Sequence, residues 1–352
     1  MLVMESVDLK KLARLLNLSI STVSKALRDS YDISKQTKER VIALANELNY
    51  QPNPHASSLR RHKSKTIAVI IPEIANNFFT LAINGIESIA QEKGYHVLIY
   101  ITHEDTEKEV AFIKHLHNGR VDGVLISLSS TTKDYDHIKE LQERGLPIVF
   151  FDRVYEHLNT ACITTDDYES SYKATQHLID KGCTNIAHLM FAESTSIGNK
   201  RMKGYVDAIH DNGLPFDEKM IVHCTNDDEQ DYKLLEKIFR SKRPDGVFAS
   251  VERYAILSYD VCNRLKLSIP EDIKLISFSN LQAAAFLDPP LSTIRQPAFD
   301  IGKEAASILF KALDKKMFKL KQENIVFKST LVERDSTSNG IIRKASDNKK
   351  VF

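Results

Sequence analysis

Apolar side chains recur at helical spacing in three short segments of the first fifty residues. These segments are predicted to be helices over residues 9–16, 20–28 and 35–48. Asp8, Ser19 and Ser34 stand just before them, where a side-chain oxygen can accept hydrogen bonds from free N–H groups at a helix start. Two short helices joined by a brief turn form a helix-turn-helix, and the third helix completes its core.

The second of these helices is poorly suited to a core. Its middle part offers only Val23, Ala26 and Leu27 as an inward face. Its outward positions are Ile20, Ser21, Ser24 and Lys25. In a helix-turn-helix the second helix presents such residues to base edges in the major groove, and small polar side chains permit close approach. The alternative is a three-helix bundle whose polar face only meets water.

A short basic segment, residues 53–64, follows the predicted head at residues 1–52. Asn53 is a good helix cap and Pro54 suits a first helical position, so about two helical turns are expected. Leu59 is a large apolar residue in a strongly basic stretch with Arg60, Arg61, Lys63 and Lys65. A leucine so placed is a candidate wedge for a DNA minor groove. The alternative is a solvated basic linker.

From Thr66 onward the pattern changes to alternating strands and amphipathic helices. A first series of apolar runs covers residues 66–71, 95–101, 122–127 and 147–152, and a second covers 186–191, 220–224, 245–250 and 273–279. Near-continuous apolar runs indicate strands buried on both faces. The sequence therefore predicts two doubly wound parallel-sheet α/β lobes, with ligands binding at the carboxyl ends of the strands in the cleft between them.

The predicted core covers residues 65–335. Lobe 1 is expected at about 65–165 and 295–322, where a helix over residues 298–313 returns to the first sheet, and lobe 2 at about 166–294 and 323–335. Residues 336–352 are polar and charged and are expected to form a frayed tail without a coiled coil.

Charge and composition narrow the classes of function. Residues 1–65 carry twelve Lys and Arg against six Asp and Glu, a net charge of +6, which leaves −5 for the rest of a chain whose total is +1. A basic head on a mildly acidic body suggests a polyanionic partner at one end only. The four cysteines are far apart and no export signal or long apolar run is evident. We therefore expect no metal site, no disulfide framework, no membrane segment and a cytoplasmic location.

Enzymes and transport proteins are the main alternatives. The chain lacks a Walker loop, a dinucleotide-binding glycine motif, a nucleophile elbow and a zinc-protease motif. Asp166 and Asp167 are expected to cap a helix in which His177 is an ordinary residue, so we expect neither catalysis nor a cofactor. A solute-binding protein of a transport system would fit the core alone, but it should carry an export signal and lack the basic head.

Several motifs together resemble the LacI/GalR family of bacterial transcription regulators. They are "TVSKAL", "LNYQPNPHASSLR", "KTIAVIIPEIANNFF", "VDGVLIS", "RMKGY", "IPEDIKLISFSN" and "PPLSTIRQPAFDIG". The resemblance covers about residues 8–330. It implies a helix-turn-helix, a hinge helix and a core similar to type I periplasmic sugar-binding proteins. It also implies a homodimer that binds a near-palindromic operator and whose DNA affinity a small effector changes. Repression is the family's commoner mode and is the one we expect, with activation as the alternative.

The resemblance assigns roles to residues of the head and hinge. Ile20, Ser21 and Lys25 match positions that face bases, while Thr22 and Ser24 match positions near phosphates. In the hinge helix that Asn53 caps, Ala56 and Leu59 match residues at the central minor groove. There Leu59 would pry apart a base step, at a cost offset by the contacts of the bent DNA.

The resemblance also assigns a set of residues to the effector pocket. They are Asn76, Phe78, Ser127, Asp152, Arg201, Val251, Ser279 and Gln296. An aromatic at position 78 can stack on a sugar, and the fork of Arg201 can bind hydroxyls, a carboxylate or a phosphate. The alternative for Arg201 is a salt bridge between two helices.

The pocket departs from the family pattern at three places, which involve four residues. Relatives usually have Asn-Asp where this chain has Val251 and Glu252, an acid at Ser279, and often an aromatic at Asn226. An ordinary neutral hexose is therefore in doubt. A smaller, charged or phosphorylated ligand, a protein co-regulator, or a pocket without a ligand all stay open.

Overall fold

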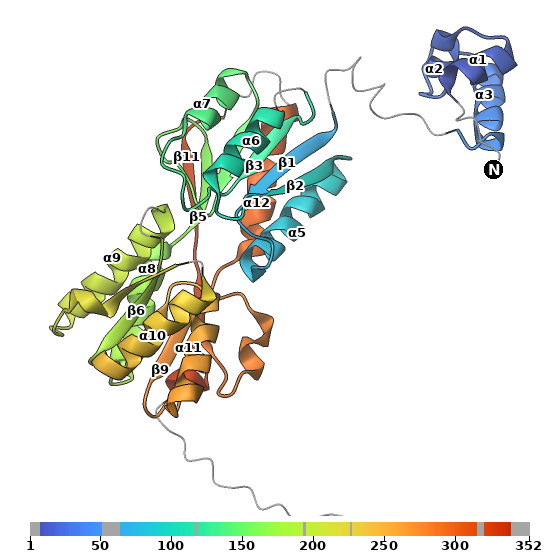
Figure 1. The fold of residues 1–352 in the computed structure, drawn as a ribbon. Helices are drawn as coiled ribbons and strands as arrows, with labels where there is room; N and C mark the ends of the chain where they lie inside the picture. The colour runs from blue at the N-terminus through green and yellow to red at the C-terminus, as the bar shows by residue number, and fades with distance from the viewer. Residues whose placement is uncertain are drawn as a thin grey trace, which may run out of the picture. The chain divides into compact units, whose positions relative to one another are not determined.

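The computed structural model describes residues 8–50, 64–116, 119–192, 195–225, 227–314 and 320–338. The chain divides into two compact units, a head of residues 1–64 and a core of residues 65–352 (Figure 1). The predicted hinge residues Asn53, Ala56 and Leu59, and the position of Asn226, lie outside the described residues.

The head contains the three predicted helices. They are α1 (Leu9–Leu16), α2 (Ile20–Ala26) and α3 (Lys35–Glu47). The side chains of Asp8, Ser19 and Ser34 each accept a hydrogen bond from a backbone N–H of the first turn, as predicted. Helix α2 ends two residues earlier than expected. Leu12, Val23 and Val41, one from each helix, are fully buried and form the centre of the small core.

The first lobe is a six-stranded sheet in the order β11-β5-β4-β3-β1-β2. Its strands are β1 (Thr66–Ile71), β2 (His96–Ile101), β3 (Gly123–Ile126), β4 (Ile148–Phe151), β5 (Ala161–Thr165) and β11 (Glu323–Phe327). Its helices are α5 (Asn77–Glu92), α6 (Thr106–Leu116), α7 (Asp136–Glu143) and α12 (Ala298–Asp314). Helices α5 and α12 pack on one face of the sheet, and α6 and α7 on the other. All strand pairs of this sheet are parallel.

The second lobe repeats this plan in the order β12-β10-β9-β8-β6-β7. Its strands are β6 (Ile186–Phe191), β7 (Ile221–Cys224), β8 (Gly246–Ala249), β9 (Lys274–Phe278), β10 (Ser292–Arg295) and β12 (Thr330–Val332). Its helices are α8 (Asp167–Asp180), α9 (Ser196–Asp211), α10 (Asp228–Lys242) and α11 (Glu252–Leu265), with short 3₁₀ turns at Glu218–Met220, Gln282–Phe286 and Asp335–Thr337. Helices α8 and α9 cover one face, and α10 and α11 the other. Only β12 is antiparallel to its neighbour. The predicted pair of doubly wound lobes is confirmed.

Helices α5 and α12 approach each other unusually closely in the first lobe. A Cβ atom built on Gly302 would lie 1.9 Å from the backbone oxygen of Ala82, and one on Gly85 would lie 2.1 Å from that of Phe299. Since such contacts are sterically forbidden, glycine at both positions allows the two backbones to touch.

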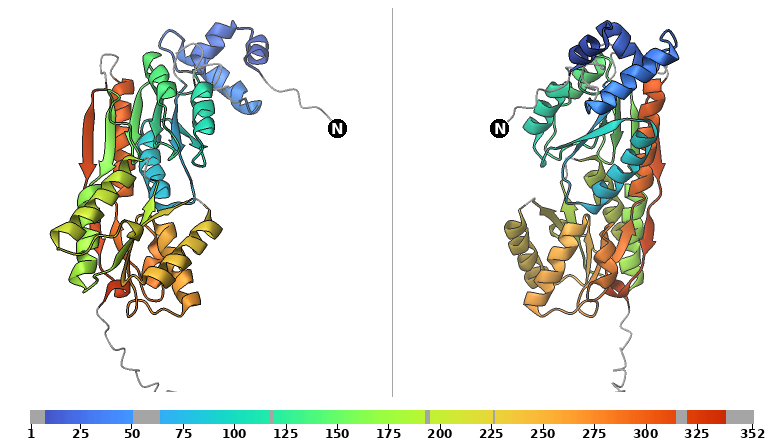
Figure 2. Two further views of the ribbon diagram at one scale, coloured as in Figure 1. Left: turned by 60° about the vertical axis from the view of Figure 1, so that its left-hand side comes forward. Right: turned by 90° about the vertical axis from the view of Figure 1, so that its right-hand side faces the viewer.

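The boundary between the lobes near the C-terminus differs from the prediction. Residues 323–327 were expected in lobe 2, but β11 pairs with β5 of the first sheet, from Glu323 opposite Ala161 to Phe327 opposite Thr165. Figure 2 shows β11 as a red strand at the outer edge of that sheet. Residues 323–327 extend the open edge of the first sheet beside β5. The chain crosses to the second lobe only at residues 328–329, before β12.

The predicted tail also begins later than expected. Ser336 and Thr337 are fully buried although their segment is polar. The Ser336 hydroxyl donates to the Leu275 carbonyl at 2.6 Å and accepts from the Ser292 N–H at 2.8 Å. The Thr337 hydroxyl lies 2.8 Å from Nε2 of His177. Hydrogen bonds offset the cost of desolvating these hydroxyls. The start of the tail was therefore predicted too early, because the prediction relied on the polarity of the segment alone.

Candidate functional site

The outer face of α2 has the exposure that the prediction requires. Ile20, Ser21 and Lys25 are exposed, while Thr22 and Ser24 are half-buried. The hydroxyls of Ser21 and Thr22 lie 2.7 and 2.8 Å from the hydroxyl of the capping Ser19. These contacts order the N-terminal turn of α2 and leave one apolar and one cationic side chain projecting from it.

Lys25 is held by an acid of the following loop. Its Nζ lies 2.5 Å from Oδ2 of Asp32, and this hydrogen bond lowers the pKa of the Asp32 carboxyl. Both side chains are partly exposed, so the ion pair is weak and can open. Any anion that binds Lys25 must therefore compete with Asp32.

The second candidate site is a small cavity between the two lobes of the core. Its volume is about 40 Å³, and its lining comprises Asn76, Phe78, Phe79, Asp152, Arg153, Ile197, Arg201, Ser250, Val251, Glu252, Phe278, Ser279, Asn280 and Gln296. The structure thus brings together seven of the eight predicted pocket residues. The exception, Ser127, is fully buried and donates to Asp152 from outside the lining.

Arg201 is a buried cation of this cavity with several bonds to the protein. Its Nε donates to Oδ1 of Asp167 at 2.8 Å, and another guanidinium nitrogen lies 2.7 Å from the same oxygen. A third nitrogen donates to the Ser250 carbonyl at 2.6 Å, and the guanidinium stacks 3.8 Å from the ring centre of Phe278. The alternative of a salt bridge between helices is thus present, joining α9 to α8. Arg201 lines the cavity with its charge already paired.

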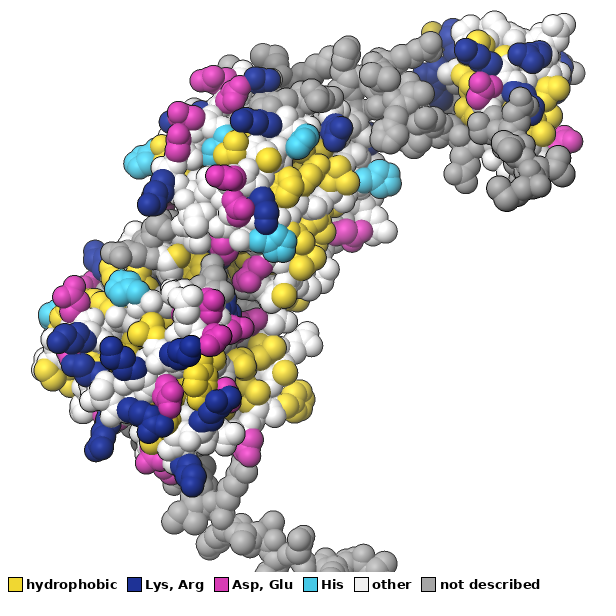
Figure 3. All heavy atoms as spheres, in the orientation of Figure 1, with side chains coloured by type: hydrophobic (Ala, Val, Ile, Leu, Met, Phe, Trp, Pro, Cys, Tyr) yellow, Lys and Arg dark blue, Asp and Glu magenta, His cyan; other side chains and the backbone are white. Residues whose placement is uncertain are grey.

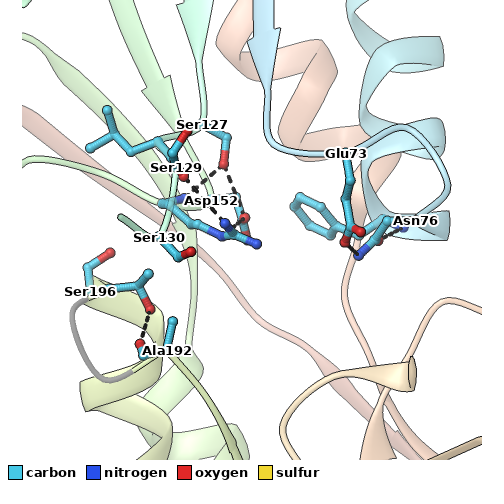
Figure 4. Close-up of polar contacts among 12 residues, drawn as sticks. Glu73, Asn76, Ser127, Ser129, Ser130, Asp152, Ala192 and Ser196 are labelled. Carbon is cyan, nitrogen blue, oxygen red and sulfur yellow. Dashed lines mark hydrogen bonds and ion pairs between the residues drawn. The ribbon is translucent and has the colours of Figure 1, made fainter. Parts of the chain in front are cut away.

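Asp152 is a buried carboxyl directly after β4. Burial raises its pKa to about 6, against the opposing effect of the charges of Arg153 and Arg201. Its Oδ2 accepts from the Ser127 hydroxyl at 3.3 Å. Figure 4 shows Ser127 and Asp152 close together, and Glu73 and Asn76 close together near the start of α5; all four residues belong to lobe 1.

Asn76 and Gln296 are ordered by bonds to the protein. Oδ1 of Asn76 caps α5 by accepting from the Phe78 N–H at 2.9 Å, and Nδ2 of Asn76 donates to Glu73 at 2.7 Å. Nε2 of Gln296 donates to the Thr165 hydroxyl at 3.0 Å. The Phe78 ring is buried and packs edge-on against Phe79.

Arg153 is a pocket residue that the sequence analysis missed. It is 4% exposed, and one of its nitrogens donates to both carboxylate oxygens of Glu104 at 2.7 and 2.8 Å. Its guanidinium lies 4.6 Å from the ring centre of Phe191, which belongs to the other lobe. The available signal was its place directly after Asp152 at the carboxyl end of a strand.

Glu252 is the second residue whose role was missed, although its departure from the family pattern was noted. Its carboxylate accepts hydrogen bonds from the Ser279 hydroxyl at 2.8 Å and from the side-chain amide of Asn77 at 2.8 Å. Val251, the other departing residue, precedes α11 and offers the cavity only an apolar side chain. An acid therefore does contact position 279, but it comes from α11.

The adjacent acids Asp166 and Asp167 both have structural partners. Oδ1 of Asp166 accepts from the Ser170 hydroxyl and from the Ser329 N–H, each at 2.8 Å, and Asp167 pairs with Arg201. Asp166 precedes α8 as predicted, although its side chain makes no capping bond. No cluster of three His, Cys, Asp or Glu side chains suited to a metal occurs among the described residues. Nor does any helix in the described parts of the chain have the length and apolarity to span a membrane.

Two family models match the chain, one over the head and one over the core. Residues 8–53 match the bacterial regulatory proteins of the lacI family, and residues 64–334 match the periplasmic binding proteins and sugar-binding domain of the LacI family. The chain belongs to the LacI family. It is therefore a DNA-binding transcription regulator with a ligand-binding core.

Relatives match over almost their whole length. The chain is 30% identical to the transcriptional regulator DegA of Bacillus subtilis, over 93% of this chain and 96% of DegA. It is 28% identical to the ribose operon repressor of Halalkalibacterium halodurans, over 94% of this chain and 97% of that repressor. A crystal structure of the lac repressor dimer bound to operator and the anti-inducer ONPF has the same fold, with a TM-score of 0.80, 20% identity and coverage of 95% and 99%.

Proposed function

We propose that this LacI-family chain is a homodimeric repressor that binds a near-palindromic operator and responds to a sugar or sugar derivative in the inter-lobe cleft. The observation that carries the proposal is the exposed face of α2, with Ile20, Ser21 and Lys25 outward on a helix that a buried three-helix core holds in place. A bacterial DNA partner implies that the protein works in the cytoplasm. We assign it no catalytic activity, since the family consists of regulators.

DNA recognition on this proposal divides between bases and phosphates. Ile20, Ser21 and Lys25 would contact base edges in the major groove, and Thr22 and Ser24 would lie near phosphates. The hinge contacts of Asn53, Ala56 and Leu59 stay a prediction. Because the first 65 residues carry a net +6, affinity for DNA should fall steeply as salt rises.

The surface of the core supports a dimer. Leu98 and Ile99 on the edge strand β2 are each more than 40% exposed, as is Ile256 on α11. Figure 3 shows hydrophobic side chains gathered along one edge of both lobes. An exposed edge strand with large apolar side chains is a surface that a second copy can cover. Two copies would present two heads, which is what a near-palindromic operator requires.

The class of effector follows from the cleft. Its lining combines the aromatic rings of Phe78, Phe79 and Phe278 with polar groups, a combination suited to a polyhydroxyl compound; the polar groups include those of Asn76, Asp152 and Gln296. Two related proteins point the same way, since one is named a ribose operon repressor and the other was solved with cellobiose.

The operator can be found by selecting duplexes from a random DNA library with the full-length protein. We expect enrichment of an inverted repeat, and loss of that enrichment in Lys25→Ala. The matched control is Lys233→Ala, which removes an exposed lysine on α10 of the core and should leave the selected sequence unchanged. Absence of any enriched sequence, or an enriched sequence without inverted symmetry, would refute the operator proposal.

The effector can be sought by thermal denaturation of the full-length protein with sugars, sugar phosphates and sugar acids. A ligand at a hundred times its dissociation constant stabilises the folded state by about 2.7 kcal/mol, which raises the melting temperature measurably. A compound that raises the melting temperature should also change operator affinity. A compound that binds without any change in operator affinity would contradict its assignment as effector.

A further inference from the structure

Glu252 joins the two lobes across the cleft. It is the first residue of α11 in lobe 2, and it contacts Asn77, the first residue of α5 in lobe 1. One carboxylate oxygen accepts from the Asn77 side-chain amide at 2.8 Å and from the Asn77 backbone N–H at 3.3 Å. The other oxygen accepts from the Ser279 hydroxyl at 2.8 Å. The Glu252 side chain thus accepts three hydrogen bonds, two from lobe 1 and one from lobe 2.

The carboxylate also lies in a favourable field. The N-terminus of an α-helix carries a partial positive charge, because its first N–H groups have no partner within the helix. Glu252 is in the first turn of α11, and it accepts a hydrogen bond from the first N–H of α5. The N-termini of both helices therefore stabilise one negative charge between the lobes.

Glu252 belongs to two neighbouring spaces. It lines the inner cavity of about 40 Å³, and it also lines an outer pocket of about 470 Å³ together with Asn76, Arg153 and Val251. The inner cavity is too small for a sugar, since even a benzene-sized ligand fills a cavity of about 150 Å³. The outer pocket has room for one. These four side chains therefore form the partition between the outer pocket and the residues of the inner cavity.

We propose that Glu252 is a built-in latch that holds the cleft closed without ligand and that an effector must displace. The proposal rests on the proposed function for the role of that effector, but the latch itself is a property of the free protein. A displacing ligand has to supply acceptor oxygens to Asn77 and Ser279 in place of the carboxylate. Hydroxyl, carboxylate or phosphate oxygens meet this requirement, and apolar compounds do not.

The test is hydrogen–deuterium exchange of the full-length protein, measured by mass spectrometry without DNA or ligand. In Glu252→Ala we expect backbone amides of residues 73–82 and 250–258 to exchange about tenfold faster or more, because a charge-assisted bond between the lobes is lost. The matched control is Glu229→Ala, which removes an acid of an exposed ion pair on α10. Exchange in these two segments should be the same in the control as in the unchanged protein.

A second variant covers the case in which Glu252→Ala does not fold. Asn77→Ala removes the lobe 1 side-chain donor without changing the charge of the chain, and it should give the same local acceleration. The Val154 N–H also donates to the Ser196 hydroxyl and Lys200 donates to Glu156 between the lobes, so exchange elsewhere in the core should change little. Exchange in residues 73–82 at the unchanged rate in either folded variant overturns the latch.

The two proposals fail in different experiments. A latch defect is read in free protein, so it does not depend on whether the chain binds an operator. Operator selection uses the unchanged protein, so it does not depend on the latch. Accelerated exchange without an enriched operator would support the latch and refute the operator proposal. An enriched operator with unchanged exchange would support the operator proposal and refute the latch.

Discussion

Arg201→Ala should destabilise the core as well as alter the pocket. The side chains of Arg201 and Asp167 are 4% and 1% exposed, and their closest contact is 2.7 Å. Removing one partner of a buried ion pair leaves an uncompensated buried charge, which costs about 3–5 kcal/mol. We expect a loss of this size in the free energy of unfolding, measured by urea denaturation of the full-length protein. Far-UV circular dichroism is the suitable signal, since the chain has no Trp.

A double-mutant cycle shows whether the charge of Asp167 causes this loss. In Asp167→Asn the carboxylate becomes a neutral amide of the same size, so combining it with Arg201→Ala should restore about 2 kcal/mol relative to the sum of the single changes. The matched control is Arg240→Ala, which breaks an exposed pair with Glu236 on α10 and should cost less than about 0.5 kcal/mol. If the two single changes are additive, or if Arg201→Ala costs no more than the control, the buried pair does not stabilise the core.

Three further predictions concern other parts of the molecule. Burial gives Asp152 a folded-state pKa of about 6, against 3.8 for the free group. Protonation of this carboxyl therefore stabilises the folded state, and the stability that it contributes below pH 4 is lost as pH rises through 6. Between pH 4 and pH 7, the free energy of unfolding of Asp152→Asn should rise by about 3 kcal/mol relative to that of the unchanged protein, as measured by urea titrations. Gly302→Ala should lower the free energy of unfolding by about 3 kcal/mol or more, because its Cβ would overlap the backbone of α5. The control Gly213→Ala has a φ of +65° and open space around it, so it should lower the free energy of unfolding by about 1 kcal/mol. Equal shifts in melting temperature would contradict the close packing of α5 and α12. Asp32→Asn should release Lys25 and remove a negative charge, and DNA affinity at low salt should therefore rise about threefold or more. Unchanged affinity in a fluorescence anisotropy titration would show that the ion pair does not restrain Lys25.

The head could be predicted almost completely because its signals are local. Asp8, Ser19 and Ser34 each cap the helix that follows them, and a capping bond spans only two or three residues. The long apolar strands were found for a similar reason, since burial on both faces leaves a continuous apolar run. Strand β5 was missed because its sequence, "ACITT", is short and half polar, although all five residues are buried.

The sequence predicted which residues line the cleft but not the hydrogen bonds that these residues make. Seven of the predicted residues line the cavity, because the carboxyl ends of parallel strands meet there whatever the side chains are. The partner of Arg201 could not be named, since Asp167 was interpreted as a helix cap. The hydrogen bond that Asn77 donates to Glu252 joins residues 175 positions apart, and it depends on how the two lobes close on each other. No spacing within one segment contains that information.

The bonding of the cleft restricts what can regulate this protein. Arg201, Asp152, Gln296 and Glu252 each have a hydrogen-bond partner within the chain. A ligand that displaces one of these contacts without replacing it leaves a buried polar group unpaired, at a cost of about 1–3 kcal/mol for each group. A ligand that supplies matching oxygens avoids this cost. On the proposed latch, selectivity in this cleft follows from the exchange of one set of hydrogen bonds for another, and the exchange at Glu252 releases the bond between the lobes.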